Sequence, residues 1–381
     1  MSLAKLELRS FRNYRHLKLD LSPDITVFTG RNGIGKTTIL EAVSLLGSGR
    51  SFRSARNLDF VQKKEEAAIL KGTANNFGLI SDLEVRVYPQ SKKVFVDEKL
   101  AKTSRQLIEL LPTIVFSPGD HRIIEGDSTD RKQFLNRAAI NVDWEYQDDL
   151  NSYNKALQQR NRVLKDQGEA IASSGRTALL DVLAIWDEQL IHYGSRLIAR
   201  RNFYLSDLRP LLTNEYAKIS QSSDHCDLGY LPFGEESEPV PCDTEVEIRN
   251  YFAQKLRDSL RRDCFSGSSQ VGPHKDEIQL TLNGNRVKFY GSQGEKRTCA
   301  LALRLGELAL FRAKVHRMPV LLFDDVSSEL DSARRQSLVQ LLQEEKTQVL
   351  ITATELPSSL MDDVGKTFEQ LELQAVGDRT E

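Results

Sequence analysis

The strongest constraint on the fold is a glycine-rich run that follows a short apolar segment. The run is Gly30-Arg31-Asn32-Gly33-Ile34-Gly35-Lys36-Thr37, and it fits the pattern G-x-x-x-x-G-K-[ST] at every fixed position. The apolar residues 25–29 precede it, and apolar residues at helical spacing follow it over 39–46. A strand, a glycine loop and a helix in this order build a phosphate-binding loop, because backbone N–H groups and the helix N-terminus converge on one anion. We therefore predict an α/β core organised around that loop.

Each residue type in the loop has a predicted role. The glycines let backbone N–H groups approach phosphate oxygens without interference from a Cβ atom. Lys36 is expected to reach the β- and γ-phosphates, and the Thr37 hydroxyl is expected to ligate Mg²⁺. The predicted ligands are ATP and Mg²⁺, and the predicted nucleotide contacts are Gly30, Arg31, Asn32, Gly33, Ile34, Gly35, Lys36, Thr37 and Thr38.

A second motif lies near the C-terminus, where four apolar residues at 320–323 are followed by Asp324 and Asp325. This pattern predicts a buried strand whose tip delivers carboxylates to a cleft. Asp324 is expected to hold Mg²⁺. Asp325 stands where ABC ATPases usually carry a glutamate that activates the attacking water, so we expect it to act as general base, although a strand ending in solvated acids would look the same. About 290 residues separate Lys36 from Asp324, which indicates a core split by an insertion.

The third motif defines the class of ATPase. The motif consists of Ser292, Gln293, Gly294 and Glu295, and Ser292 lies about 30 residues before Asp324. A predicted helix with apolar residues between 300 and 308 follows the motif. The motif resembles the ABC signature SGGQ, with Gln293 in place of a glycine and Glu295 in place of the glutamine. A hydroxyl, a bare backbone and a helix N-terminus are kept, and these can bind a γ-phosphate. In ABC proteins this motif acts across a dimer interface.

Other ABC elements are recognisable but altered. Residues 328–331 (SELD) resemble the D-loop, which contacts the nucleotide site of the partner. Thr354 stands where many ABC proteins have a histidine that senses the γ-phosphate. The usual glutamine after the strand at 112–118 is absent, and Gly119 and Asp120 are found there instead. Which residue senses the γ-phosphate therefore stays open.

The remaining sequence predicts two lobes. Alternating residues at 3–20 and 66–100 predict antiparallel strands, and residues 112–118, 319–323 and 347–352 predict buried strands. A hairpin is expected over 276–290, and residues 221–245 look like a mobile surface segment. Helices are expected at 130–139, 143–166, 176–205, 207–220, 245–262 and 331–344. The fold class is an ABC-type P-loop ATPase head with a mixed sheet plus a helical second lobe: residues 1–125 and 265–381 form the ATPase core (lobe I), and residues 126–264 form helical lobe II, which leads into the signature at 292–297.

Composition limits the partners and the compartment. The formal net charge is −2, so a DNA site would have to be a local basic patch. The four cysteines, Cys226, Cys242, Cys264 and Cys299, are widely spaced and form no CxxC pair, which favours reduced thiols over a zinc site or disulfides. The charged N-terminus does not look like a signal peptide, and no run approaches 18 apolar residues. We expect a cytoplasmic protein with no membrane partner.

Several further motifs carry a family resemblance over about residues 3–355. They are FRNY at 11–14, GRNGIGKTTILEA at 30–42, SFR at 51–53, YNKALQQRN at 153–161, QVGPHKDE at 270–277, SQGEKR at 292–297 and LLFDDVSSELD at 321–331. Together they resemble the RecF family. One departure is Lys275, where arginine is commoner in that family.

The resemblance implies an SMC-like head without a long coiled coil and a homodimer formed in the ATP-bound state. It further implies slow ATP hydrolysis, binding of single- and double-stranded DNA near gaps, and work with RecR and RecO in recombinase loading. The alternatives are an ABC-type ATPase subunit of a non-DNA machine and a non-hydrolysing nucleotide switch. Three basic clusters are candidates for DNA contact, but each could equally be a solvated face paired with acids: Arg131, Lys132 and Arg137; Arg196, Arg200 and Arg201; Arg257, Arg261 and Arg262.

Overall fold

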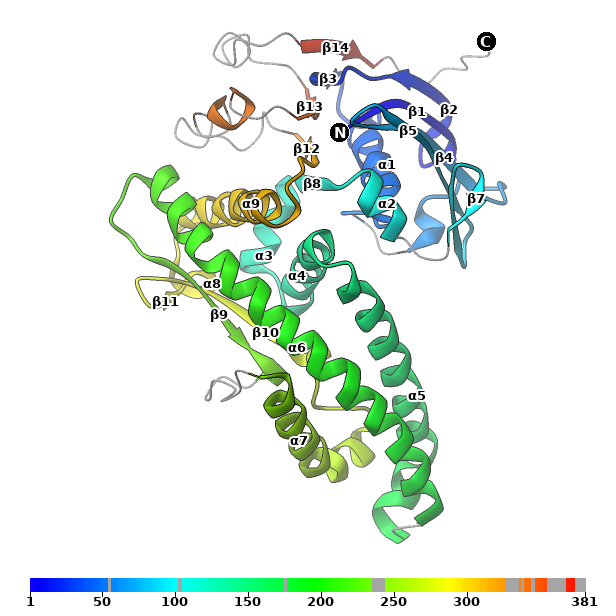
Figure 1. Cartoon of the computed structure of the whole chain (residues 1–381), viewed down its shortest axis with the longest axis vertical. Helices are drawn as coiled ribbons and strands as arrows, with labels where there is room; N and C mark the ends of the chain where they lie inside the picture. The colour runs from blue at the N-terminus through cyan, green and yellow to red at the C-terminus, as the bar shows by residue number, and fades with distance from the viewer. Residues whose placement is uncertain are drawn as a thin grey trace. The chain divides into compact units, whose positions relative to one another are not determined.

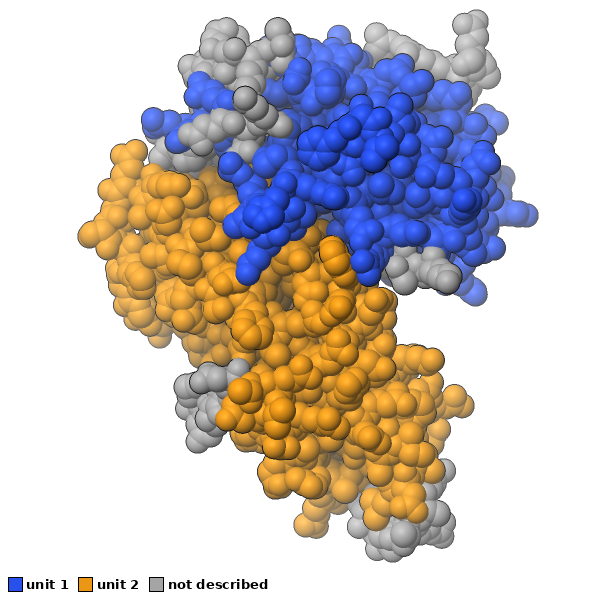
Figure 2. All heavy atoms as spheres, viewed as in Figure 1, with its two compact units in different colours: residues 1–120, 311–381 blue, residues 121–310 orange. Residues whose placement is uncertain are grey.

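The computed structural model describes residues 1–53, 56–101, 105–174, 177–234, 244–325, 336, 339–343, 347–354 and 368–373. The chain divides into two compact units (Figure 2), which are residues 1–120 with 311–381, and residues 121–310. We call these unit 1 and unit 2 and describe each by itself.

Unit 1 contains a parallel sheet in the order β14-β3-β13-β12-β8. Three of its strands were predicted and are buried along their whole length: β3 (Ile25–Thr29), β12 (Val320–Phe323) and β13 (Val349–Ala353). The predicted strand at 112–118 is β8 (Thr113–Phe116). The edge strand β14 (Phe368–Glu372), which is mostly exposed, was not predicted.

A second sheet in unit 1 is antiparallel, in the order β2-β1-β4-β5-β6-β7, as the alternating segments predicted. Its strands are β1 (Ser2–Phe11), β2 (Tyr14–Asp20), β4 (Ala68–Asn76), β5 (Leu79–Val87), β6 (Lys92–Val96) and β7 (Lys99–Leu100). Helix α1 (Lys36–Ser48) packs against strands of both sheets, namely β4 and β5 on one side and β8, β12 and β13 on the other. The core of unit 1 therefore surrounds the helix that follows the phosphate-binding loop (Figure 1). Unit 1 also contains the short helices η1 (Asn57–Asp59), α2 (Arg105–Leu110) and η2 (Pro118–Asp120).

Unit 2 is mainly helical. Its helices are α3 (His121–Glu125), α4 (Ser128–Val142), α5 (Glu145–Ser174), α6 (Thr177–Ser220), α7 (Glu245–Ser266), α8 (Val287–Tyr290) and the greater part of α9 (Gln293–Val315), with the short η3 (Pro232–Gly234) and η4 (Pro273–Lys275). Helices α5, α6 and α7 pack side by side (Figure 1).

The expected break between helices at 205 and 207 is wrong, because α6 runs continuously through Pro210. A proline inside a helix removes one hydrogen bond and costs about 3 kcal/mol. Apolar side chains on both sides of Pro210 are buried, including Leu205, Leu208, Leu212 and Tyr216. Their burial offsets the lost hydrogen bond, so tertiary packing overrides the local signal.

The expectation of a mobile segment at 221–245 is also wrong in part. Strand β9 (Cys226–Leu231) pairs antiparallel with β10 (Glu277–Leu282), which forms a hairpin with β11 (Asn285–Arg286). The hairpin expected over 276–290 is shorter than predicted, because residues 287–290 form helix α8. The hairpin turn has positive φ at Asn283 (50°) and Gly284 (82°), as a tight two-residue turn requires. Residues 235–243, which include Cys242, lie outside the described residues.

The boundary between the units differs from the expected one. We placed residues 265–310 with the ATPase core, whereas they pack within unit 2. The reason is the pairing of β10 with β9, a partner that the sequence did not reveal. Of the predicted helix at 331–344, residues 336 and 339–343 are described and helical. In the described ranges, no helix has both the length and the apolarity needed to cross a bilayer.

Candidate nucleotide site

The predicted phosphate-binding loop adopts a conformation that depends on its glycines. Strand β3 ends at Thr29, and φ is positive at Gly30 (144°), Gly33 (82°) and Gly35 (113°). Non-glycine residues rarely adopt these angles. Gly35 is the N-cap of α1, so the loop ends where the helix presents its free N–H groups.

The FRNY segment explains why Gly35 must be glycine. A Cβ atom at this position would lie 2.5 Å from Nδ2 of Asn13 and 2.7 Å from the hydroxyl oxygen of Tyr14. Asn13 Nδ2 also donates a hydrogen bond to the Ile34 carbonyl at 2.9 Å. The turn between β1 and β2 therefore packs directly against the phosphate-binding loop and fixes its shape.

Lys36 is held within the loop. Its ammonium donates to the carbonyl oxygens of Gly30 at 2.6 Å and of Arg31 at 3.1 Å. The side chain is largely buried, so the charge lies close to the loop backbone. Phosphate oxygens at the loop would be stronger partners for this ammonium than the two neutral carbonyls are.

Asp324 lies next to the loop, at the tip of β12. Its Oδ1 accepts hydrogen bonds from the hydroxyls of Thr37 at 2.7 Å and Thr352 at 2.8 Å. Burial raises the pKa of the Asp324 carboxyl above its usual value, and the two hydroxyls and the positive charge of Arg53 oppose that rise. A half-buried carboxylate beside a hydroxyl presents hard oxygen atoms, which are the ligand type that Mg²⁺ prefers. Thr37 and Asp324, the two predicted Mg²⁺ ligands, are thus in direct contact.

Asp325 follows in a constrained backbone conformation. Its φ is 52°, which is uncommon for a residue other than glycine. Its N–H donates to Oγ1 of Thr352 at 2.9 Å, so the hydroxyl of Thr352 contacts both acidic residues. Thr352 on β13 was not predicted as a site residue.

A cavity of about 590 Å³ lies over the loop, within unit 1. Asp325 and Thr352 line it together with residues of the loop and of α1. Two cations, Arg12 and Arg53, also line it and were not predicted as site residues. Its full lining is Arg12, Asn13, Asn32, Gly33, Gly35, Lys36, Thr37, Thr38, Arg53, Asp59, Asp325 and Thr352.

Both arginines are oriented by one buried carboxylate, Glu41 on α1. Arg12 makes two hydrogen bonds to it, at 2.9 and 2.7 Å, and Arg53 lies 3.8 Å away. Ser51 also donates to Glu41, which is fully buried. The segments FRNY, TTILEA and SFR thus converge on Glu41. Their recurrence in the family pattern was the signal that could have identified Arg12 and Arg53.

The signature residues lie in unit 2, at the start of α9. Ser292 and Glu295 form a reciprocal capping pair: the Ser292 N–H donates to Oε2 of Glu295 at 2.6 Å, and the Glu295 N–H donates to Oγ of Ser292 at 3.3 Å. Glu295, a departure from the usual signature, therefore stabilises the helix end. Gln293 donates to Glu125 at 3.0 Å, and Lys296 pairs with the same carboxylate at 3.1 Å.

Ser292, Gln293 and Gly294 are exposed, so the tip of α9 is presented to solvent. The other altered elements are only partly described. The Thr354 hydroxyl donates to Oδ1 of Asn32 in the loop at 3.3 Å. Asp120 accepts a hydrogen bond from the Ser117 N–H at 2.9 Å, which is a local turn. The D-loop candidate at 328–331 lies outside the described residues.

Comparison with known proteins identifies the family to which the chain belongs. The family model "RecF/RecN/SMC N terminal domain" matches residues 2–370. The chain is 32% identical over 364 residues to the "DNA replication and repair protein RecF" of Geotalea daltonii, with 96% of each chain covered. It is 35% identical over 359 residues to the protein of the same name from Nostoc punctiforme, with 94% of each covered. The chain belongs to the RecF family.

Solved structures agree with this assignment to the RecF family. The mediator protein RecF-ATPrS of the RecFOR pathway matches with a TM-score of 0.85 at 31% identity, covering 99% of this chain and 98% of the other. The RecF-ATP structure matches with a TM-score of 0.81 at 32% identity, covering 93% of each chain. An Smc head domain from Pyrococcus furiosus matches with a TM-score of 0.51 at 17% identity, which shows the fold alone. The predicted fold class, an SMC-like ATPase head with a mixed arrangement of strands and a helical lobe, is confirmed.

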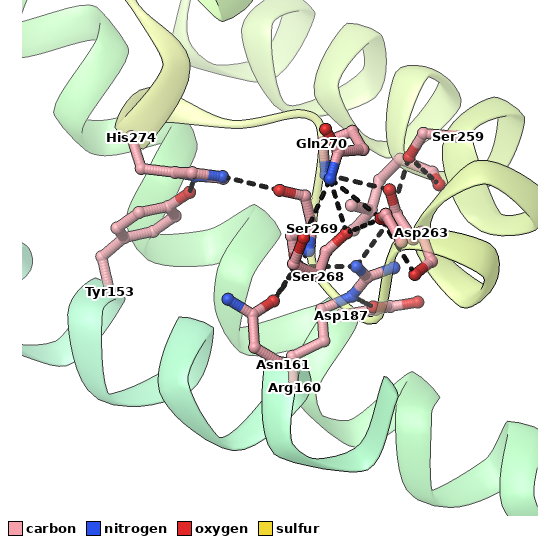
Figure 3. A network of polar contacts seen from close by, with 12 residues as sticks. Tyr153, Arg160, Asn161, Asp187, Ser259, Asp263, Ser268, Ser269, Gln270 and His274 are labelled. Carbon is pink, nitrogen blue, oxygen red and sulfur yellow. Dashed lines mark hydrogen bonds and ion pairs between the residues drawn. The ribbon is translucent and has the colours of Figure 1, made fainter. Parts of the chain in front are cut away.

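Two RecF-type motifs of unit 2 meet in a buried polar network (Figure 3). Arg160, which is fully buried, pairs with Asp263 at 2.6 Å and with Asp187 at 2.5 Å, and donates to Ser269 Oγ at 2.8 Å. His274 accepts a hydrogen bond from the Tyr153 hydroxyl at 2.7 Å. The segments YNKALQQRN and QVGPHKDE therefore join α5 to the loop after α7.

The three predicted basic clusters differ in their burial and ion pairing. Arg131 and Arg201 are buried and pair with Glu277 and Asp276, which excludes them as phosphate contacts. Arg196 and Arg200 pair with acids on α5 and just before it. In the third cluster, Arg257, Arg261 and Arg262 are exposed on α7. Of the three clusters, this is the one in which all three cations are exposed.

Proposed function

We propose that this protein is a Mg²⁺-dependent ATPase of DNA replication and repair that acts on DNA as an ATP-bound dimer. The observation that carries the proposal is the cavity of unit 1. There the phosphate-binding loop, Thr37 and two oriented arginines line one space, and the Thr37 hydroxyl donates a hydrogen bond to Asp324. The relatives named as DNA replication and repair proteins, and the RecF-ATP structure, support the substrate and the process.

Within the cavity, each group has a defined task. Lys36 and the loop N–H groups bind the phosphates, and Arg12 and Arg53 add positive charge beside them. Thr37 and Asp324 would hold Mg²⁺, which neutralises phosphate charge when bound. The residues fit such a cation, because the half-buried Asp324 carboxylate and the Thr37 hydroxyl place two oxygen ligands 2.7 Å apart.

Asp325 is the proposed general base. Its carboxylate accepts a proton from the attacking water, while Thr352 fixes the Asp325 backbone through the 2.9 Å hydrogen bond. Because aspartate is one methylene shorter than glutamate, slow hydrolysis is expected. Measuring phosphate release for the wild type and Asp325→Asn tests this: turnover should fall at least about 100-fold, the lower end of the contribution of a general base. Equal rates would exclude Asp325 as the base.

The exposed tip of α9 supports a site completed by a second subunit. Ser292 and Gly294 of one protomer would bind the γ-phosphate held by its partner, at the positive N-terminal end of the α9 dipole. Hydrolysis removes that bridge and opens the dimer. Ser292→Arg should then bind ATP with normal affinity yet remain monomeric in size-exclusion chromatography with ATP, because the arginine side chain fills the space of the phosphate. A Ser292→Arg dimer would contradict a trans signature contact.

The DNA proposal rests on the family and on the third basic cluster. We propose that Arg257, Arg261 and Arg262 contact the phosphates of duplex DNA near single-strand gaps, and that the protein works with RecR and RecO to load a recombinase. Each lost phosphate contact should reduce the salt dependence of binding by about one unit of slope. Replacing all three with serine should therefore lower the slope of log K against log salt by about three, measured on gapped duplex with ATP.

ATPase stimulation distinguishes this function from a non-DNA machine. Gapped duplex should increase phosphate release, whereas membranes or ribosomes should leave it unchanged. The reverse pattern would assign the protein to another class of ABC-type machine.

A further inference from the structure

Two aromatic side chains stand beside the signature residues in unit 2. Helix α8 ends at Phe289 and Tyr290, two residues before Ser292, and these side chains are 63% and 77% exposed. Two adjacent exposed aromatic side chains provide the type of contact area that the centres of protein interfaces use. Ser292, Gln293 and Gly294 are exposed too, so the aromatic pair and the signature tip are two exposed segments separated only by the half-buried Gly291.

The segment that carries the aromatic pair is anchored on its inner side. Val287 is buried, and the Gly291 N–H donates to the Val287 carbonyl at 2.9 Å, which closes the turn. Lys288 donates to the Gly126 carbonyl at 2.7 Å, and its ammonium lies 5.7 Å from the Phe289 ring centroid. The backbone that carries the aromatic pair is therefore fixed by its own contacts, and the two rings extend from a pre-organised turn.

The signature tip is too small to form a stable dimer interface by itself, so further residues must contact the partner. A stable interface buries about 800 Å² on each partner. Serine and glycine supply little of that area, whereas an aromatic side chain buries about 150–250 Å². Two aromatic residues adjoining the tip would therefore provide a large share of the area that a dimer closed by this tip requires.

The opposing surface offers suitable chemistry. The loop and cavity to which the signature tip is proposed to bind carry the exposed Arg31 and the half-exposed Arg53. Guanidinium groups pack favourably on aromatic faces. Electron-rich rings on one protomer thus complement a cationic rim on the other.

We propose that Phe289 and Tyr290 are dimer-anchoring residues that dock onto the rim of the nucleotide cavity of a second copy of this chain. This inference rests on the proposed function, since it requires an ATP-dependent dimer. It adds residues that contact the partner protein rather than the nucleotide.

The test compares dimerisation of full-length variants by sedimentation velocity with saturating ATP. Tyr290→Ala should raise the dimer dissociation constant at least tenfold, and Phe289→Ala combined with it should raise the constant further. Tyr290→Phe should keep the wild-type value within threefold, because the ring is retained. Phe265→Ala is the matched control: Phe265 is 73% exposed in the same unit but lies on α7, away from the signature.

ATP affinity of the monomer, measured with a fluorescent analogue at low protein concentration, should stay within twofold of wild type in every variant. Equal affinity and equal thermal midpoints would show that the variants are folded. A double variant that dimerises within twofold of wild type would overturn the inference. So would a variant that dimerises normally but loses affinity for duplex DNA, because the aromatic pair would then be a nucleic-acid contact. If the wild type itself fails to dimerise with ATP, the proposed function fails instead.

Discussion

Protonation of His274 gives a quantitative test of the buried network in unit 2. Nε2 of His274 lies 3.0 Å from the Ser269 carbonyl, which can only accept, so Nε2 carries the hydrogen. Nδ1 then accepts from the Tyr153 hydroxyl at 2.7 Å. Burial, together with the positive charges of Lys275 and Lys132, lowers the pKa of His274 from 6.5 to about 4. The folded protein therefore contains the neutral imidazole.

The sign and size of the effect follow from linkage. The folded-state pKa of His274 lies below the unfolded value, so its contribution to stability is complete above pH 6.5 and is lost as pH falls toward 4. One pKa unit corresponds to about 1.36 kcal/mol. Lowering the pH from 7.5 to 5 should thus reduce the free energy of unfolding by about 2 kcal/mol through this residue.

Tryptophan fluorescence can isolate the response of unit 2, because the two tryptophans of the chain, Trp144 and Trp186, both belong to it. Guanidinium unfolding of the whole protein would be followed at pH 7.5 and 5 for the wild type and His274→Gln, whose amide keeps one donor and one acceptor. The variant should show a pH-dependent loss smaller by about 2 kcal/mol. Identical losses in the two proteins would refute the assignment of a buried neutral imidazole.

Three further predictions concern the nucleotide site. Lys36→Met should abolish ATP binding, and with it the dimer seen by sedimentation with ATP, because the loop loses its phosphate-binding cation; an ATP-dependent dimer of this variant would contradict the proposed site. Thr352→Val removes the hydroxyl that contacts both acidic residues, so the turnover number should fall about tenfold, equivalent to about 1.4 kcal/mol, whereas Thr352→Ser should restore it; unchanged turnover in the valine variant would argue against this role. Glu41→Ala leaves the Arg12 guanidinium without its buried partner and should destabilise unit 1 by about 3–5 kcal/mol, measured by calorimetry; a shift in thermal midpoint below about 2 °C would show that the pair is dispensable.

The residues of the nucleotide site were predictable where the chemistry is local. The loop at 30–37, the buried strand before Asp324 and the capping pair of Ser292 and Glu295 each depend on neighbours within a few positions, so residue type and spacing determine them. The contact between Thr37 and Asp324 joins distant segments. It was nevertheless predictable, because parallel strands bring their carboxyl ends to one edge of the sheet.

Contacts between segments distant in the sequence decided which charged residues are paired and where an unpredicted strand forms. Glu41 on α1 forms ion pairs with Arg12 and Arg53 because the β1–β2 turn and the segment after α1 both pack against α1. The burial of Arg201 against Asp276, which excludes a cation that looked available for DNA, is another such case. The strand at 226–231 likewise exists because β10 supplies its hydrogen-bonding partner.

The sequence by itself thus determined the phosphate loop, the acidic strand tip and the family, since these are patterns of consecutive residues. The tertiary structure alone decided which charges are paired, where α6 continues through Pro210 and how the chain divides into units. The physical reason is that burial and ion pairing depend on which distant segments come together, and their free energies exceed the local preferences that a linear pattern records.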